Sequence, residues 1–179
     1  NPALAHNIGI GPSALQNNNT TYNIAIGDSA LYGNTAGGVI GIGYRALMMN
    51  NAFDNIAIGY NALDSNTTGN RNVAIGNHAL RKNKTGNVSV AIGYGALANS
   101  VGVFNTAVGD ATLFNNTTGY SNTAIGSNVM DFNTTGYANT AMGVNSMYNN
   151  VAGFSNTAIG YQSLFQNDST SGNTAVGLY

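Results

Sequence analysis

The sequence predicts an all-β protein, a parallel β-solenoid of eleven coils with 16 or 17 residues per coil. Three features of the chain predict this fold. A short motif that ends in Gly recurs along the whole chain, Glu is absent while Lys and Gln are scarce, and the repeat is too short for helical repeats.

The repeat is easiest to see at Asn122 to Gly126 and at Asn139 to Gly143, where Asn-Thr-Ala is followed by an apolar residue and Gly. The residue before this Gly is always Ile, Val or Met. Leu or Met stands four residues after it, and Asn stands seven residues after it except at Ser100. Residues 1–179 are therefore predicted to form a single continuous repeat array. The glycines that close the motif are Gly11, Gly27, Gly43, Gly59, Gly76, Gly93, Gly109, Gly126, Gly143, Gly160 and Gly177.

The composition excludes several classes of protein. Hydrophobic residues make up 43% of the chain, which is enough to fold, but charged residues make up only 6%. The chain has no Glu and is rich in Asn and Gly, which favour turns over helices. A formal net charge of -1 argues against electrostatic capture of nucleic acid or of an anionic membrane surface. No apolar run is long enough for direct insertion into a membrane.

The short period suits one coil of a narrow solenoid, because helix-pair repeats need about 33 residues or more. Asn23 to Ile26 is short and β-branched, as expected of a strand. A second segment around Ala30 and Leu31 is predicted to form the opposite wall, and the Asn-Thr-Thr-Gly stretches to turn the chain back. Asn side chains stacked at the strand spacing of about 4.8 Å are expected to hydrogen-bond to one another.

The predicted core consists of the aliphatic residue before Gly and the Leu four residues after it. The small Ala two residues before Gly is predicted to lie on the other face of the strand, where another chain approaches closely. Strands that are apolar on both faces need a partner on each side, so an oligomer is expected. The predicted core residues are Ile26, Ile58, Ile75, Ile92, Ile125, Ile159, Leu31, Leu63, Leu80, Leu97 and Leu164. The predicted close-packing or interface residues are Ala25, Ala57, Ala74, Ala124 and Ala158.

The segments NTAIGYQSL (Asn156 to Leu164) and NTTGYSNTAIG (Asn116 to Gly126) resemble the head repeats of trimeric autotransporter adhesins and the similar repeats of phage tail fibres. The resemblance covers the whole chain. It implies a left-handed β-roll whose three chains form one intertwined or side-by-side homotrimer. Neither the membrane-anchoring barrel nor the self-cleaving chaperone that ends many such proteins is expected within residues 1–179.

The resemblance also implies a function: a structural and adhesive segment of a trimeric surface or virion fibre that mediates attachment to a host cell or surface. The expected location is extracellular, on a bacterial cell surface or a virion tail fibre. The expected partners are other copies of the chain and a host surface receptor or glycan. Bacterial adhesin, phage fibre and filament all remain open as the parent protein, and the receptor is not specified.

Two alternatives come from other classes of protein. One is a self-assembling extracellular filament subunit, because the ends of a solenoid can stack on one another. The other is an ice-binding β-solenoid, because Thr replaces Ile or Val three residues before Gly in the second half of the chain. These threonines are Thr106, Thr123, Thr140, Thr157 and Thr174.

An aromatic column is predicted eleven residues after Gly, at Phe104, Tyr120, Tyr137 and Phe154, with Tyr22 at the same position in the first copy. One interpretation is a platform that binds sugar rings or apolar receptor groups. The other is a stack of rings that covers a corner of the coil or an interface between chains.

Basic residues concentrate in one part of the chain. One interpretation is a site for anionic glycans. The other is that Arg81 pairs with Asp64, which stands at the same repeat position one coil earlier. The basic residues of this group are Arg71, His78, Arg81, Lys82 and Lys84.

No enzyme activity is predicted, because no nucleophile, base and acid recur together. His6 and His78 are far apart in the array, and the chain contains no Cys. No catalytic residue, metal site or cofactor is therefore expected.

Overall fold

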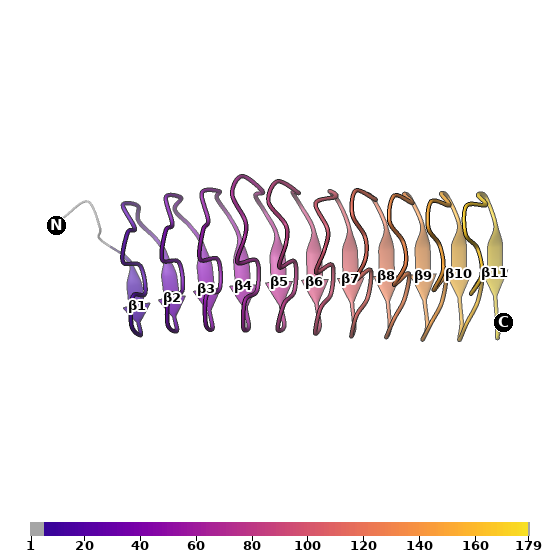
Figure 1. Ribbon diagram of the computed structural model, residues 1–179, viewed down its shortest axis with the longest axis horizontal. Helices are drawn as coiled ribbons and strands as arrows, with labels where there is room; N and C mark the ends of the chain where they lie inside the picture. Colours follow the sequence, from indigo (N-terminus) through magenta and orange to yellow (C-terminus); the bar gives the residue numbers. More distant parts are fainter. Residues whose placement is uncertain (1–5, 179) are drawn as a thin grey trace.

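The computed structural model describes residues 6–178 and shows a β-solenoid of about 17 residues per turn. Eleven parallel strands pair in chain order to form one sheet along the rod (Figure 1). The predicted all-β solenoid is confirmed. The strands are β1 (Ile8–Ile10), β2 (Ile24–Ile26), β3 (Ile40–Ile42), β4 (Ile56–Ile58), β5 (Val73–Ile75), β6 (Val90–Ile92), β7 (Thr106–Val108), β8 (Thr123–Ile125), β9 (Thr140–Met142), β10 (Thr157–Ile159) and β11 (Thr174–Val176).

Each strand pairs with the next at identical positions of the motif. Ile24 stands opposite Ile40 in β2 and β3, and Thr123 stands opposite Thr140 in β8 and β9. The pairing stays in register although some coils have 16 residues and others 17, because the turn between two buried asparagines absorbs the extra residue. This turn runs from Asn50 to Asn55 in a short coil and is one residue longer in the next.

The wall opposite the sheet consists of hydrogen-bonded turns, where the sequence predicted a second segment around Ala30 and Leu31. The Leu31 N–H donates to the carbonyl of Ala46 in the next coil at 3.0 Å. Leu31 has a left-handed backbone with φ 52°, and so does Ser29 with φ 58°. Left-handed Leu is costly, and we attribute its recurrence to the complete burial of the side chain.

The strands face the opposite way from the prediction, with their Ala side chains in the interior of the coil. Ala25, Ala57, Ala74, Ala124 and Ala158 point into the coil and are fully buried. They do not face another chain, so their prediction as interface residues is wrong. The reason is the width of the coil: a Cβ added to Gly41, at the same position, would lie 3.1 Å from Leu31 Cγ. The interior therefore has room for little more than a methyl group beside each Leu.

The isoleucines that were predicted to fill the core lie on the outer face of the sheet, because successive strand residues point to opposite sides. Among them, Ile26 and Ile58 are each 36% exposed. The leucines were predicted correctly, except that Leu164 is only partly buried near the last coil. The misplaced isoleucines are Ile26, Ile58, Ile75, Ile92, Ile125 and Ile159.

A column of buried asparagines seven residues after Gly runs along the rod. Asn133 Nδ2 donates to Asn116 Oδ1 at 2.7 Å, and Asn150 Nδ2 donates to Asn133 Oδ1 at 2.7 Å. Asn133 Nδ2 also donates to the carbonyl of Gly136 in its own turn. The predicted hydrogen bonding of stacked asparagines is confirmed. We call this column the turn ladder.

A second column of asparagines stands just before the strands, except that Val39 precedes β3 and Ser89 precedes β6, and we call it the strand ladder. The Asn139 backbone N–H donates to Asn122 Oδ1 at 3.0 Å, and Asn122 Nδ2 donates to the carbonyl of Gly136 at 2.8 Å. The side chain thus satisfies a backbone donor and a backbone acceptor of the following coil. The two ladders explain why buried positions can be Asn at all.

Replacement of Asn133 by Ala is expected to destabilise the protein by about 2 to 4 kcal/mol, because it leaves buried polar groups of Asn116 and Asn150 with fewer partners. Chemical denaturation measures the free energy of unfolding. Thr135→Ala, an exposed change in the same turn, is the control. Equal stability of the two variants would contradict the role of the ladder.

Candidate functional site

The outer face of the sheet carries two columns of aliphatic or Thr side chains along the rod. One column stands three residues before Gly and the other one residue before it, as Ile24 and Ile26 do in β2. The outer residues are partly or largely exposed in every strand, for example 37% at Ile92 and 45% at Met142. The rod therefore presents a long face that its own chain leaves uncovered, with two apolar columns over β1 to β6 and one apolar and one Thr column over β7 to β11.

Three rings of the predicted aromatic column form a continuous stack. The centroids of Tyr120 and Tyr137 are 4.8 Å apart with the rings 4° from parallel, and those of Tyr137 and Phe154 are 4.9 Å apart at 2°. The rings thus follow the spacing of the coils and cover one corner of the solenoid. Stacking is confirmed for these three residues, and binding by them remains a prediction.

Phe104 does not belong to this column, and that part of the prediction is wrong. Its coil is one residue shorter than the next, so Phe104 falls immediately before Asn105, as Ser121 falls immediately before Asn122. The Ser121 N–H donates to the carbonyl of Val103, which is the residue that aligns with Tyr120. The offset of eleven residues from the preceding Gly ignores the shorter turn of this coil. An offset measured back from the Asn before the next strand includes it.

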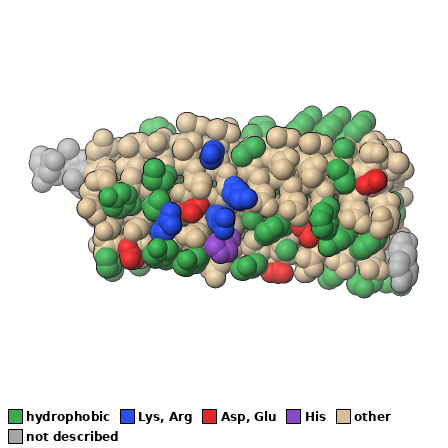
Figure 2. All heavy atoms as spheres, viewed as in Figure 1, with side chains coloured by type: hydrophobic (Ala, Val, Ile, Leu, Met, Phe, Trp, Pro, Cys, Tyr) green, Lys and Arg blue, Asp and Glu red, His purple; other side chains and the backbone are tan. Residues whose placement is uncertain are grey.

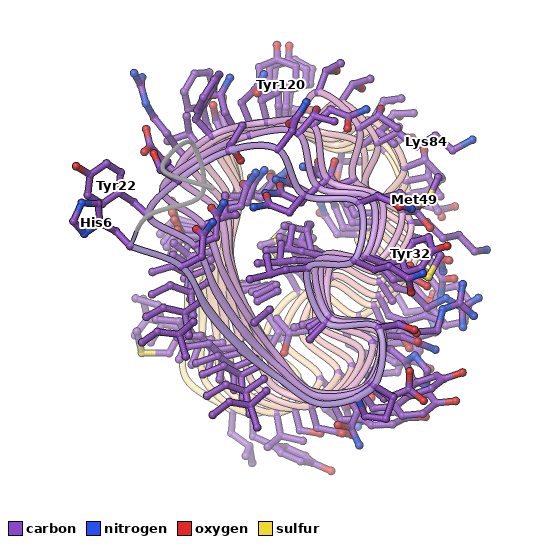
Figure 3. All side chains as sticks on the ribbon, turned by 90° about the vertical axis from the view of Figure 1, so that its left-hand side faces the viewer. His6, Tyr22, Tyr32, Met49, Lys84 and Tyr120 are labelled. Carbon is purple, nitrogen blue, oxygen red and sulfur yellow. The ribbon has the colours of Figure 1, made fainter. Side chains whose placement is uncertain are left out.

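Tyr22 is also outside the column and stacks on His6, with ring centroids 4.9 Å apart and planes 3° from parallel. Viewed along the rod, Tyr22 and Tyr120 project from different parts of the coil (Figure 3). The aromatic side chains therefore form several short stacks around the rod and not one binding platform.

The basic residues do not pair as predicted. Asp64 accepts a hydrogen bond from the Ser65 hydroxyl at 2.9 Å and makes no ion pair with Arg81. Within residues 6–178, no Lys or Arg forms an ion pair with a carboxylate. Figure 2 shows Lys and Arg side chains gathered around the middle of one face, together with a histidine.

A pocket of about 330 Å³ lies at this basic group. One small residue, Ala98, leaves space between the side chains of neighbouring coils. His78 lies beside it with its ring edge-on to Tyr60 and Tyr94, and its Nδ1 is buried without a hydrogen-bond partner. The residues that line the pocket are His78, Arg81, Lys82, Tyr94, Ala98, Asn99 and Phe114.

The pKa of Asp131 departs clearly from its ordinary value. Burial raises the pKa of Asp131, and the hydrogen bond from Asn115 Nδ2, 3.1 Å from Asp131 Oδ1, opposes part of that rise. The carboxylate form of Asp131 is therefore disfavoured in the folded chain relative to the unfolded chain.

The described residues contain neither a cluster of candidate metal ligands nor a helix that could span a membrane. Within residues 6–178, no group of three or more His, Cys, Asp or Glu side chains could hold a metal ion. The same residues contain no helix able to cross a membrane.

Comparison with known proteins gave no match to a family model, to a curated protein or to a solved structure. The resemblance in the repeat motif therefore remains a prediction. The structural features that bear on function are the exposed outer face of the sheet, the aromatic stacks and the basic pocket.

Asp131→Asn is expected to raise the melting temperature at pH 7, because it removes a partly buried charge and keeps a group that accepts from Asn115. A raised native pKa means that the wild-type protein recovers this stability as the pH falls through that pKa towards the ordinary value of 3.8. The advantage of the variant should therefore shrink in acid. Thermal melts across this range, with the exposed Asp110→Asn as control, measure it. An advantage that grows in acid would contradict the assignment.

Proposed function

We propose that the chain is a structural and adhesive segment of a trimeric extracellular fibre that attaches a bacterial cell surface or a virion to a host cell or surface. Three copies lie side by side with their sheets facing one another. The number three and the left-handed coil rest on the resemblance of the repeat motif. A host receptor or glycan is the second partner.

The observation that carries this proposal is the uncovered apolar face of the sheet. In β1 to β6 both outer residues of each strand are apolar, as Ile24 and Ile26 are, and in β7 to β11 one of the two is Thr. A parallel sheet that is apolar on both faces is normally covered on both sides. A long contiguous apolar patch marks an interaction surface. Another copy of the chain fits it well, because it presents the same columns at the same spacing along the whole rod.

Sedimentation at micromolar concentration tests the assembly. The wild-type chain is expected to sediment as a trimer. Ile75→Asp with Ile92→Asp places two charges on the outer face of neighbouring strands and should dissociate it, since buried unpaired charges are costly. Thr118→Asp with Thr135→Asp adds the same charge at exposed turns and should leave the trimer intact. A wild-type chain that is folded and monomeric would contradict the proposal.

One observation favours ice binding as a second candidate. Thr106, Thr123, Thr140, Thr157 and Thr174 are paired strand to strand and lie on the outer face of the sheet. A regular rank of threonines beside aliphatic side chains would then meet water if no other chain covers it. Thermal hysteresis that disappears with Thr123→Lys and Thr140→Lys would favour this function over the fibre.

A further inference from the structure

We propose that the pocket at His78, Arg81 and Phe114 binds an acidic sugar, namely a pyranose ring that carries a carboxylate or a sulfate. This inference deepens the proposed attachment function by naming the class of ligand at one site. It depends on that function only for its biological use, because binding to the pocket is measured independently of adhesion.

The pocket exists because one coil has a small residue where its neighbours have large ones. Arg81, Ala98 and Phe114 stand at the same position in three successive coils, as shown by the Lys82 N–H donating to the Ala98 carbonyl and the Asn99 N–H to the Phe114 carbonyl. The short side chain of Ala98 leaves a hollow between those of Arg81 and Phe114. Its volume of about 330 Å³ lies at the small end of the range for ligand pockets.

Gly95 leaves room for the Phe114 ring, which lines the pocket. A Cβ at Gly95 would lie 3.0 Å from two ring carbons of Phe114, so the ring rests directly over this backbone. Gly95 also has φ 65°, a left-handed conformation that Gly adopts without strain. The Phe114 ring therefore has a defined place at the pocket, and a flat apolar ring face suits the C–H face of a pyranose.

The charged side of the pocket selects an anion. Arg81 and Lys82 are exposed and have no carboxylate partner, since Asp64 bonds to Ser65 instead. The guanidinium group of Arg81 presents paired donors that match the geometry of a carboxylate or sulfate. An acidic ligand would thus meet cations that the protein itself leaves unneutralised.

Two further side chains at the pocket, those of Tyr94 and Asn99, suit the ring and the hydroxyl groups of a sugar. The ring of Tyr94 is 57% exposed and also lines the pocket, which supplies a second aromatic side chain. The amide of Asn99 can donate to and accept from sugar hydroxyls, and it donates only a long 3.5 Å bond to Asn115 Oδ1. Anionic, apolar and hydroxyl-binding groups thus converge on one hollow.

The pocket and the proposed trimer interface occupy different segments of the repeat. Every residue that lines the pocket comes from the turns after β5, β6 and β7. The interface is built from strand side chains on the outer face of the sheet. Neither surface uses the other's residues, so a defect at one can be separated from a defect at the other.

Calorimetric titration with three disaccharides tests the inference: one containing glucuronate, one containing a sulfated sugar, and a neutral one of the same size. The purified chain is used in its natural assembly state. We expect the glucuronate or the sulfated probe to bind with a dissociation constant of about a millimolar or better, and the neutral probe to bind at least about tenfold more weakly. The acidic probe that binds identifies the anion.

Two variants probe the pocket by different means. Arg81→Ala with Lys82→Ala removes its charges, and Ala98→Phe fills it while keeping them. Phe occupies the equivalent position at Phe114 and Phe165, so the fold accommodates that change. Each variant is expected to weaken binding of the acidic probe about tenfold or more.

Arg71→Ala with Lys84→Ala is the matched control, because it removes the same charge at exposed residues outside the pocket. The control should bind like the wild type. Equal weakening by both charge variants, with Ala98→Phe unchanged, would mean diffuse attraction and overturn the inference, as would the absence of binding to both acidic probes. Sedimentation of the same samples reports the trimer separately and so distinguishes failure of this site from failure of the fibre proposal.

Discussion

Hydrogen bonding of the buried asparagines is the constraint on which the rest of the structure depends. A buried amide without partners is costly, and in this solenoid its partners lie largely in the coils before and after it. Asn122, for example, uses Oδ1 to accept the Asn139 N–H and uses Nδ2 to reach Asn105 and Gly136. Each coil thus satisfies the polar groups of its neighbours, which is why the motif is repeated so closely.

The two ladders also shape the surfaces. They hold successive coils at one register, so side chains at the same repeat position form columns along the rod. Inside, the Leu column leaves space only for Ala on the strand, and the larger Ile and Val side chains are left outside. On the outside, aromatic rings at the same repeat position of neighbouring coils stack on one another, as those of Tyr120 and Tyr137 do. A surface site can then arise where a column is interrupted, as it is at Ala98.

The sequence was sufficient to predict the solenoid, its period and the stacking of its asparagines, because all three follow from spacing. It could not decide which way the strands face. Ile26 and Ala25 are both apolar, so alternation alone does not say which is inside, and the answer depends on the reach of Leu31 from the opposite wall. The position of Phe104 was missed because one short coil shifts the count. The basic residues at the pocket were recognised in the sequence as one possible site for anionic glycans. The hollow itself could not be predicted, because it depends on the small side chain of Ala98 between those of Arg81 and Phe114 in the neighbouring coils.

The most direct test of the ladder is the coil where it is broken. Ser100 replaces the turn-ladder Asn and accepts from Asn116 Nδ2 at 2.9 Å, but donates nothing to Asn83. Asn34 and Asn50 are fully buried in coils as short as this one, so Ser100→Asn fits the backbone. Chemical denaturation should show the variant more stable by about 0.5 to 1.5 kcal/mol, the net value of a restored buried hydrogen bond. Unchanged or lower stability would contradict the claim that the asparagine ladders hold the coils together.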